Sequence, residues 1–297
     1  MSDWRTIVAE IAADNRSGAT AIAIRAAEAI AALAQHDDFT HEALSAFIPA
    51  LVAAQPSMAP LFHLANEVLW AVEEAGPGDW RHAARQAAQA RAEALRASPQ
   101  AIARHVVAAT SPLSVVLTHS ASAAVAAALR LGYAQGRVAR AICTESRPQH
   151  EGQMLARDLA AGGLPVTFVV DAAAYEALTQ ADAVWIGADA LAAAGVVNKI
   201  GSAGLGLLAG QRGVPVMVLA GRDKVWPMAL SAAPPIADRD PAEVWAEAPP
   251  GITVVNRYFD ITPWSAVTAV VMEDGAFPPE AVQALAQRVK IHPALRP

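Results

Sequence analysis

The second half of the chain contains five short apolar runs, each of which ends in a polar or charged residue. Short runs rich in Val and Ile are typical of strands buried on both faces of a parallel sheet. The carboxyl ends of parallel strands lie along one edge, where doubly wound folds bind ligands. We therefore predict that the polar groups of these ends meet at one site. The runs are VVLTHS, AICTES, VTFVVD, AVWIGAD and VMVLAGRDK, which begin at Val115, Ala141, Val166, Ala183 and Val216.

The pattern of apolar residues changes near residue 110. Before it, apolar residues recur at intervals of three and four, which predicts amphipathic helices. After it, strand-like runs alternate with helical segments such as EGQMLARDLAAGG. This predicts an α/β fold: a helical domain at residues 1–109, then a Rossmann-like, doubly wound, mostly parallel sheet domain at 110–297 that carries most of the ligand site. The Pro-rich segment at 228–251 is predicted to be a loop.

Composition excludes several classes of protein. The 297 residues, 54% of them apolar and 17% charged, suffice for a large buried core. No apolar run approaches the roughly 18 to 20 residues of a membrane helix, and the first residues do not resemble a signal peptide, so we expect a cytoplasmic protein with no membrane partner. A net charge of −6 disfavours nucleic acid as a partner.

We expect neither a metal nor a cofactor. The single cysteine, Cys143, excludes an internal disulfide and a thiolate metal cluster, and the histidines are scattered. Gly204, Gly206 and Ala209 match the GxGxxA pattern of dinucleotide-binding folds. That pattern requires a strand directly before the first glycine, whereas VVNKIGSA precedes it here. We interpret these glycines as permitting close packing of a helix on the sheet.

Candidate ligand residues follow the first two strand-like runs. At THSAS, Ser120 and Ser122 are either helix caps or, together with free helix amides, phosphate contacts. His119 is a candidate general base, a phosphate partner or a structural histidine. Glu145 and Arg147 lie two residues apart at the second strand end, and Arg147 either binds a phosphate or pairs with a neighbouring acid.

The block from residue 181 to 210 contains the most specific set. Asp189 stands at a strand end after two small residues, which leaves its carboxylate exposed. Asn198 and Lys199 precede a predicted helix start at Gly201, whose amides we expect to be free. Together these groups can bind a phosphorylated polyol. Lys199 would bind the phosphate, and Asp189 would bind hydroxyl groups or carry a proton.

Several segments resemble the family that joins the alpha, beta and delta subunits of eukaryotic translation initiation factor 2B to methylthioribose-1-phosphate isomerase and ribose-1,5-bisphosphate isomerase. They are THSAS, TESRPQHEGQMLARDL, VTFVVDAA, GADALAAAGVVNKIGSAGLGLLA and NRYFDITPWSAVTAVVMEDG, which cover most of residues 110–276. NRSGATAIAIRAAEAI is similar to the family's Arg-Gly-Ala segment, which implies that Arg16 and Gly18 face a phosphate. The resemblance also implies a homodimer or an assembly of dimers.

The resemblance implies a chemistry and also two departures from it. The family's isomerases open a sugar 1-phosphate ring and move a proton between C2 and C1 with an aspartate and a cysteine. Asp189 matches the aspartate, but Ser120 stands where the cysteine should follow His119. A hydroxyl is a far weaker acid and base than a thiol. The family's Arg-Pro-Thr segment is matched by Gln-Pro-Ser at residues 55–57, which removes a cation.

Three hypotheses of function follow. The first is an isomerase with Asp189 as proton carrier and with Ser120, His119 or water in the role of the cysteine. The second is a non-catalytic regulatory subunit that binds a sugar phosphate or a nucleoside monophosphate. The third is a structural subunit whose partner surface matters more than its crevice. We take the first as the leading hypothesis, because the expected binding residues exceed what a scaffold requires: Arg16, Gly18, His119, Glu145, Arg147, Asn198 and Lys199.

Overall fold

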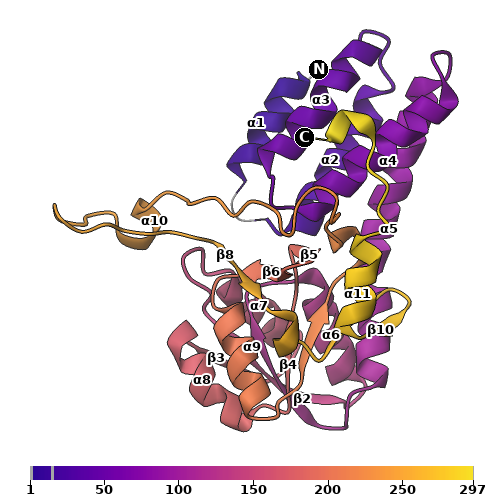
Figure 1. The fold of residues 1–297 in the computed structure, drawn as a ribbon. Helices are drawn as coiled ribbons and strands as arrows, with labels where there is room; N and C mark the ends of the chain where they lie inside the picture. The colour runs from indigo at the N-terminus through magenta and orange to yellow at the C-terminus, as the bar shows by residue number, and fades with distance from the viewer. Residues whose placement is uncertain (1–2, 15–16, 297) are drawn as a thin grey trace.

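A helical part and an α/β part make up the molecule, and one long helix runs through both (Figure 1). The computed structural model describes residues 3–14 and 17–296. The helical part contains α1 (Trp4–Ala13), α2 (Ala19–Leu33), α3 (His41–Ala54), α4 (Ala59–Ala75) and the first half of α5 (Trp80–Ala108). No helix within these ranges has the length and apolar character needed to cross a membrane.

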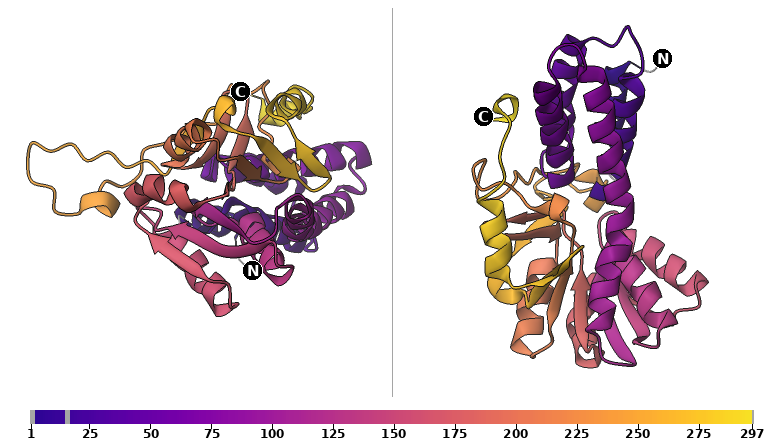
Figure 2. Two further views of the ribbon diagram at one scale, coloured as in Figure 1. Left: turned by 90° about the horizontal axis from the view of Figure 1, so that it is seen from below. Right: turned by 90° about the vertical axis from the view of Figure 1, so that its right-hand side faces the viewer.

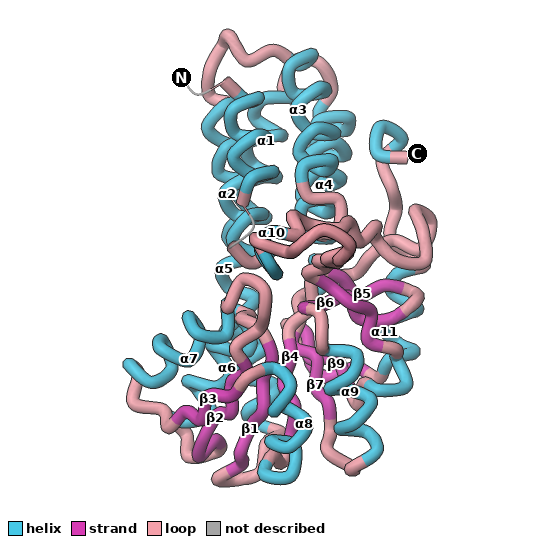
Figure 3. The backbone as a smooth tube through the Cα atoms, turned by 90° about the vertical axis from the view of Figure 1, so that its left-hand side faces the viewer, coloured by secondary structure: helices cyan, strands magenta, loops and turns pink. Residues whose placement is uncertain are grey.

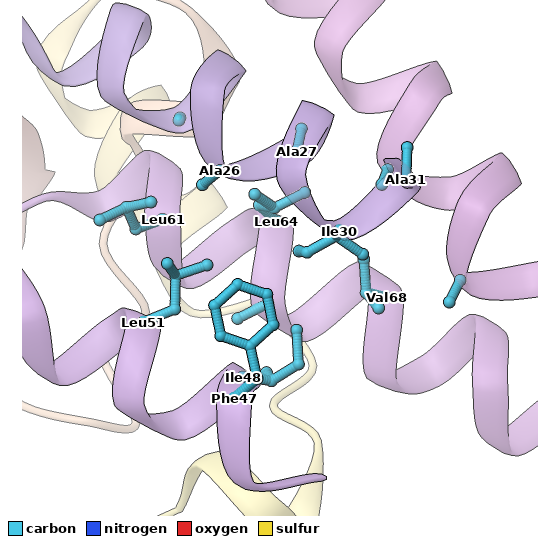
Figure 4. Packing of buried hydrophobic residues seen from close by; sticks show 14 of the residues in the cluster. Ala26, Ala27, Ile30, Ala31, Phe47, Ile48, Leu51, Leu61, Leu64 and Val68 are labelled. Carbon is cyan, nitrogen blue, oxygen red and sulfur yellow. The ribbon is translucent and has the colours of Figure 1, made fainter. Parts of the chain in front are cut away.

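Local capping interactions and glycine explain where helices of the first part begin and end. The Thr40 side chain accepts a hydrogen bond from the Ala43 amide at 3.1 Å and caps α3. Gly76 ends α4 with a φ of 72°, a conformation that disfavours residues with a Cβ. Alanines on α2 let the helices approach closely around a core that includes Ile30, Phe47 and Leu64, all fully buried (Figure 4).

The main sheet has seven strands in the order β10-β9-β7-β4-β1-β2-β3. All pairs are parallel except β9 with β10. The five runs predicted as strands are confirmed as β1, β2, β3, β4 and β7. The bounds are β1 (Ser114–His119), β2 (Val138–Thr144), β3 (Val166–Val169), β4 (Ala183–Ile186), β7 (Val216–Leu219), β9 (Ala269–Met272) and β10 (Gly275–Phe277).

The strand order of this sheet reverses beside β1. The chain adds β2 and β3 on one side of β1 and then returns to place β4 on the other side. Ligands of doubly wound folds bind at such a reversal, outside the carboxyl ends of the two strands that flank it. The residues that follow β1 and β4 are therefore the best placed for a ligand, better than those that follow β2 or β3.

Helices cover both faces of the sheet, which confirms the predicted α/β class. One hydrophobic cluster joins the sheet to α5, α6 (Ala123–Ala134) and α7 (Glu151–Ala161), and it includes the buried Cys143. Another cluster joins the opposite face to α8 (Ala174–Ala177), α9 (Ser202–Gln211) and α11 (Pro279–Ala286). The end of α5 thus packs on the sheet (Figure 2), and the division at residue 109 into two domains stays a prediction.

A second, three-stranded sheet was not predicted from the sequence. It pairs β6 (Gly195–Lys199) with β5 (Ala190–Ala192) and β8 (Phe259–Thr262), all antiparallel. Its strands are too short for a clear alternation, and β8 arrives only after a long excursion of the chain. Residues 227–257, called the excursion here, contain the short helix α10 (Ala242–Trp245), and the part around α10 protrudes from the molecule (Figure 1).

The close contact of α7 with β2 predicts the effect of a minimal substitution. A Cβ at Gly152 would overlap the carbonyl group of Thr144, so Gly152→Ala should lower the free energy of unfolding by about 1–3 kcal/mol. Gly210→Ala is the matched control, because a Cβ at Gly210 meets no atom within 4 Å and the change removes a poor helix former. Urea denaturation of both variants measures the difference. Equal stabilities would show that the contact at Gly152 is looser than described.

Candidate active site

A cavity of about 460 Å³ lies between the helical part and the carboxyl ends of β1 and β4. Figure 3 shows the helices α1–α4 placed over this edge of the sheet. Residues of both parts line the cavity, among them Gly18 and Gln55 from the helical part and Ser120, Asp189 and Lys199 from the α/β part. The site thus lies at the reversal of strand order, as the fold leads one to expect.

Asp189 follows β4 and stands beside two ammonium groups. Its amide donates to the Val197 carbonyl at 2.8 Å, which holds the residue against the second sheet. Burial raises the pKa of the Asp189 carboxyl, whereas the charges of Lys224 and Lys199 oppose this rise and the carboxylate of Glu151 adds to it. A carboxyl whose pKa is moved up in this way is suited to carry a proton between two atoms of a ligand.

Lys199 is held by a carboxylate and two aromatic rings. Its ammonium lies 2.5 Å from Glu151 Oε1, and the Lys199 side chain is 4% exposed. The same nitrogen lies 4.8 Å from the ring centre of Tyr258 and 5.8 Å from that of Phe259. The neighbouring Asn198 also lines the cavity, and its Nδ2 donates to Ser202 Oγ at 2.9 Å. The predicted grouping of Asp189, Asn198 and Lys199 around one cavity is therefore what the structure shows.

The buried pair of Lys199 and Glu151 gives a prediction about stability. Lys199→Met should lower the free energy of unfolding by about 3–5 kcal/mol, because it leaves a carboxylate uncompensated in a largely buried place. Glu151 Oε2 already has no hydrogen-bond partner. Urea denaturation should show a smaller loss for Lys199→Met combined with Glu151→Gln, and almost none for the exposed control Lys290→Met. A double variant as unstable as the single one would contradict this account.

The turn from β1 into α6 supplies the opposite wall of the cavity. Ser120 has a φ of 69°, an uncommon conformation for a residue other than glycine, and its amide donates to Ser146 Oγ at 2.7 Å. Ser122 is the N-cap of α6, and its hydroxyl accepts from the Val125 amide at 3.5 Å. The first residues of α6 line the cavity. Since the first amides of a helix lack intrahelical partners, this end of α6 suits a phosphate.

His119 is not among the described residues that line the cavity. Its side chain is 3% exposed, and both ring nitrogens have partners: Nδ1 is 2.7 Å from Thr144 Oγ1, and Nε2 donates to the Ile200 carbonyl at 2.8 Å. Of the readings left open above, this geometry favours the structural histidine. A Cβ at Gly201 would lie 3.1 Å from Nε2, so the ring also packs tightly against that turn.

Glu145 and Arg147 do not reach the cavity, contrary to the expectation that all five strand ends converge. Neither is among the described residues that line it. The Arg147 side chain donates to the Val244 carbonyl in the excursion at 3.1 Å, and Glu145 lies 3.7 Å from the His150 ring. The physical reason is strand order, because β2 lies on the side of β1 away from β4. The residues at the end of β2 therefore contact the excursion and lie away from the reversal of strand order.

The amides at the start of α9 are not free, which corrects a second expectation. Asp260 on β8 accepts from the Gly201 amide at 2.7 Å and from the Ala203 amide at 3.2 Å. A carboxylate thus occupies the positive end of this helix, where a phosphate was expected. Strand β8 brings Asp260 there by pairing with β6, a long-range contact that local sequence patterns do not reveal.

Several lining residues were missed in the sequence. Lys224 was noted within a charged strand end but not selected, although it lies 7% exposed beside Asp189. Arg239 and Tyr258 come from the excursion and its return, where no strand-end or helix-start signal marks them. Gly18, predicted to face a phosphate, lines the cavity, whereas Arg16 lies outside the described residues. Within the described ranges, no cluster of His, Cys, Asp or Glu has an arrangement suited to a metal.

Comparisons with known proteins give the family of this chain and proteins of similar sequence and fold. A sequence model of the initiation factor 2 subunit family matches residues 15–279. A ribose 1,5-bisphosphate isomerase from Haloterrigena turkmenica is 36% identical over 310 aligned positions, which cover 94% of this chain and 91% of that protein. A methylthioribose-1-phosphate isomerase from Chloroflexus aurantiacus is 34% identical over 298 positions, which cover 91% of this chain and 85% of that protein. The solved structure of translation initiation factor eIF-2B from Pyrococcus horikoshii OT3 matches with a TM-score of 0.83 and 26% identity, covering 95% of this chain and 98% of that one.

Proposed function

Because this chain belongs to the initiation factor 2 subunit family, we propose that it is an isomerase that converts a phosphorylated aldopentose into the corresponding ketose. The observation that carries the proposal is the Asp189 carboxyl, whose pKa is raised by burial and which lies beside the ammonium groups of Lys199 and Lys224. Aldose–ketose isomerisation requires a group that carries a proton and cations that stabilise developing negative charge on the sugar oxygens. One wall of the cavity supplies both.

The ligand lies between the two walls of the cavity. Its C1 phosphate contacts the start of α6, where Ser120 and Ser122 lie, and the sugar hydroxyls face Asn198 and Asp189. Asp189 in its protonated form donates its proton to the ring oxygen as the bond between that oxygen and C1 breaks, and a second acid–base group accepts the C2 proton, which leaves an enol at C1 and C2. The second group then returns a proton to C1 while the Asp189 carboxylate accepts the proton of the C2 hydroxyl, so the ketone forms at C2, both groups are restored, and the substrate and the product have the same atoms. Lys199 and Lys224 stabilise the charge that develops on the oxygens in between.

Ser120 is the candidate for the second acid–base role. Of the residues considered for that role from sequence, Ser120 lines the cavity and His119 does not. A hydroxyl removes a carbon-bound proton poorly at neutral pH, so a water molecule held beside Ser120 is the other candidate. We expect turnover to be slow for this reason.

The proposal is tested by proton NMR in heavy water. Ribose-1,5-bisphosphate and methylthioribose-1-phosphate are incubated separately with the protein, and the C2 proton signal and the ketose product are followed over time. Loss of the C2 signal together with appearance of the ketose is the expected result for one of the two sugars. Tight binding of both sugars without any exchange at C2 would contradict the isomerase.

One observation favours a second candidate function. Ser120 stands in the place of the family's catalytic cysteine, and this departure is expected of a regulatory subunit that keeps a pocket for a sugar phosphate or a nucleoside monophosphate. Such a protein binds its ligand with no turnover. We retain the expectation of a homodimer or an assembly of dimers for either function, and light scattering after size-exclusion chromatography measures the size of the assembly.

A further inference from the structure

Arg239 lies at the base of the excursion and lines the cavity. Its amide donates to the Asn256 carbonyl at 2.9 Å. The adjacent residues, Asp238 and Arg257, form an antiparallel bridge, and their side chains pair at 2.8 Å. The outgoing and returning segments of the excursion thus hold each other at this point. The backbone of Arg239 is consequently fixed, although the part of the excursion around α10 protrudes.

Among the described residues, the Arg239 guanidinium has few hydrogen-bond partners. Nη2 donates to Gln55 Oε1 at 3.4 Å, and no carboxylate within the described residues pairs with Arg239. Gln55 is 2% exposed, and its Nε2 donates to the carbonyls of Ile11 and Asp14, both at 3.0 Å, which turns Oε1 toward Arg239. A guanidinium has five N–H donors, so most remain for a ligand or solvent.

A second cation lies close to the same point. The Cζ of Arg239 is 5.1 Å from the ring centre of Tyr258, and the ammonium of Lys199 is 4.8 Å from that centre. The Tyr258 hydroxyl accepts from Gln149 Nε2 at 2.8 Å and contacts Glu243 Oε1 at 2.7 Å, so the ring is held in place. Lys199 already has Glu151 as its partner, so Arg239 is the one of these two cations that lacks a carboxylate among the described residues. An anion bound beside Tyr258 would compensate the charge of Arg239, an interaction that is stronger at the low effective dielectric of a cavity than in water.

A purely structural role for Arg239 is the competing explanation. In that case the side chain ties the excursion to the helical part through Gln55. A single bond of 3.4 Å to a neutral amide is at the limit of hydrogen-bond geometry and contributes little. The bridge between Asp238 and Arg257 already holds the base of the excursion without it. The geometry of Arg239 therefore suits a ligand better than a tie.

We propose that Arg239 binds a second anionic group of the ligand and thereby makes this site specific for a sugar that carries two phosphates. This inference rests on the proposed function, which places the first phosphate at the start of α6. The second phosphate lies on the side of the helical part, because Gln55 belongs to that part and contacts Arg239. Arg239 then determines the specificity of the site, although it belongs to the excursion and to neither sheet.

Isothermal titration calorimetry tests the inference with three probes: ribose-1,5-bisphosphate, ribose-1-phosphate and ribose-5-phosphate. Each is titrated into the wild type, Arg239→Gln and the control Arg212→Gln. Arg212 is exposed at the end of α9, does not line the cavity, and loses the same charge on substitution. Melting temperatures without ligand verify that the variants are folded.

The expected result is a selective loss of affinity. Arg239→Gln should weaken binding of the bisphosphate by about 10- to 100-fold, the usual effect of losing a charged hydrogen-bond partner. One of the two monophosphates should lose a similar factor and the other should change less than about twofold, which identifies the phosphate at Arg239. The affinity of Arg239→Lys for the bisphosphate should lie between those of the wild type and Arg239→Gln. Lysine keeps the positive charge but lacks the paired N–H donors of a guanidinium.

Three outcomes would overturn the inference: an equal loss of affinity for all three probes, no loss for any probe, or a wild type that binds the bisphosphate no more tightly than a monophosphate. The proposed isomerase fails differently. If binding shows the selective loss while the heavy-water experiment shows no exchange at C2, the specificity of Arg239 stands and the catalytic proposal is wrong. A wild type that binds none of the probes overturns the inference about Arg239, and the heavy-water experiment with methylthioribose-1-phosphate then decides whether the protein is an isomerase.

Discussion

Asp189→Asn should reduce the rate of isomerisation by about 10²- to 10⁴-fold, the usual contribution of a general acid–base group. Asparagine keeps the size and polarity of the side chain but carries no transferable proton. The dissociation constant of the sugar phosphate should therefore change little while the rate falls. Proton NMR in heavy water measures the rate, and calorimetry measures binding. Asp38→Asn, an exposed change in the helical part, is the control and should leave both unchanged.

The same substitution should alter the pH dependence of stability in a direction that the structure sets. Burial raises the pKa of Asp189 above its ordinary value of 3.8, so the folded state binds this proton more tightly than the unfolded chain does. As pH rises through the raised pKa, the wild type loses stability relative to Asp189→Asn, because it then buries a charge. Below the ordinary value both states are protonated and this difference vanishes.

Melting curves from acidic to mildly alkaline pH measure this effect. The Asn variant should melt at a higher temperature than the wild type above neutrality, and the two curves should approach each other in acid. A variant that is equally inactive but destabilised at every pH would indicate that Asp189 is a structural carboxylate. Its loss of activity would then be a consequence of unfolding and not of a missing proton carrier.

Ser120→Cys should increase the rate of exchange at C2 by about 10²-fold or more, within the range for a positioned acid–base group. An ordinary thiol has a pKa of about 8.5, and the start of a helix lowers it further. Ser120 lies two residues before Ser122, the N-cap of α6, so a thiol at this position forms a thiolate near neutral pH far more readily than a serine hydroxyl forms an alkoxide. The increase is measured by the same NMR experiment.

Two further variants make this prediction decisive. Ser120→Ala should be as slow as the wild type if water performs the second role, and slower if the hydroxyl does. Adding Asp189→Asn to Ser120→Cys should remove the gain. If Ser120→Cys binds the sugar phosphate and shows no faster exchange, the cavity lacks a catalytic geometry, and the regulatory subunit becomes the better description.

Much of the site was predictable because its parts are signalled locally. A charged residue directly after a buried strand marks Asp189, and a serine between a strand and a helix marks Ser120. Asn198 and Lys199 were also placed in the cavity, although they lie on a strand that was not foreseen. Arg239 carries no such mark, since its position depends on a contact with Gln55 across 184 residues of sequence.

The sequence by itself determined the alternation of helices and strands, the class of the fold, and which side chains stand at strand ends. These follow from the spacing of apolar residues within a few positions of each other. The tertiary structure decided which strand ends lie close together. It placed Ser120 and Asp189 on one cavity, and it placed the Arg147 side chain against the excursion. It also placed Asp260 on the helix start expected to be free. Strand order and long-range pairing depend on how whole elements pack, and no local spacing encodes them.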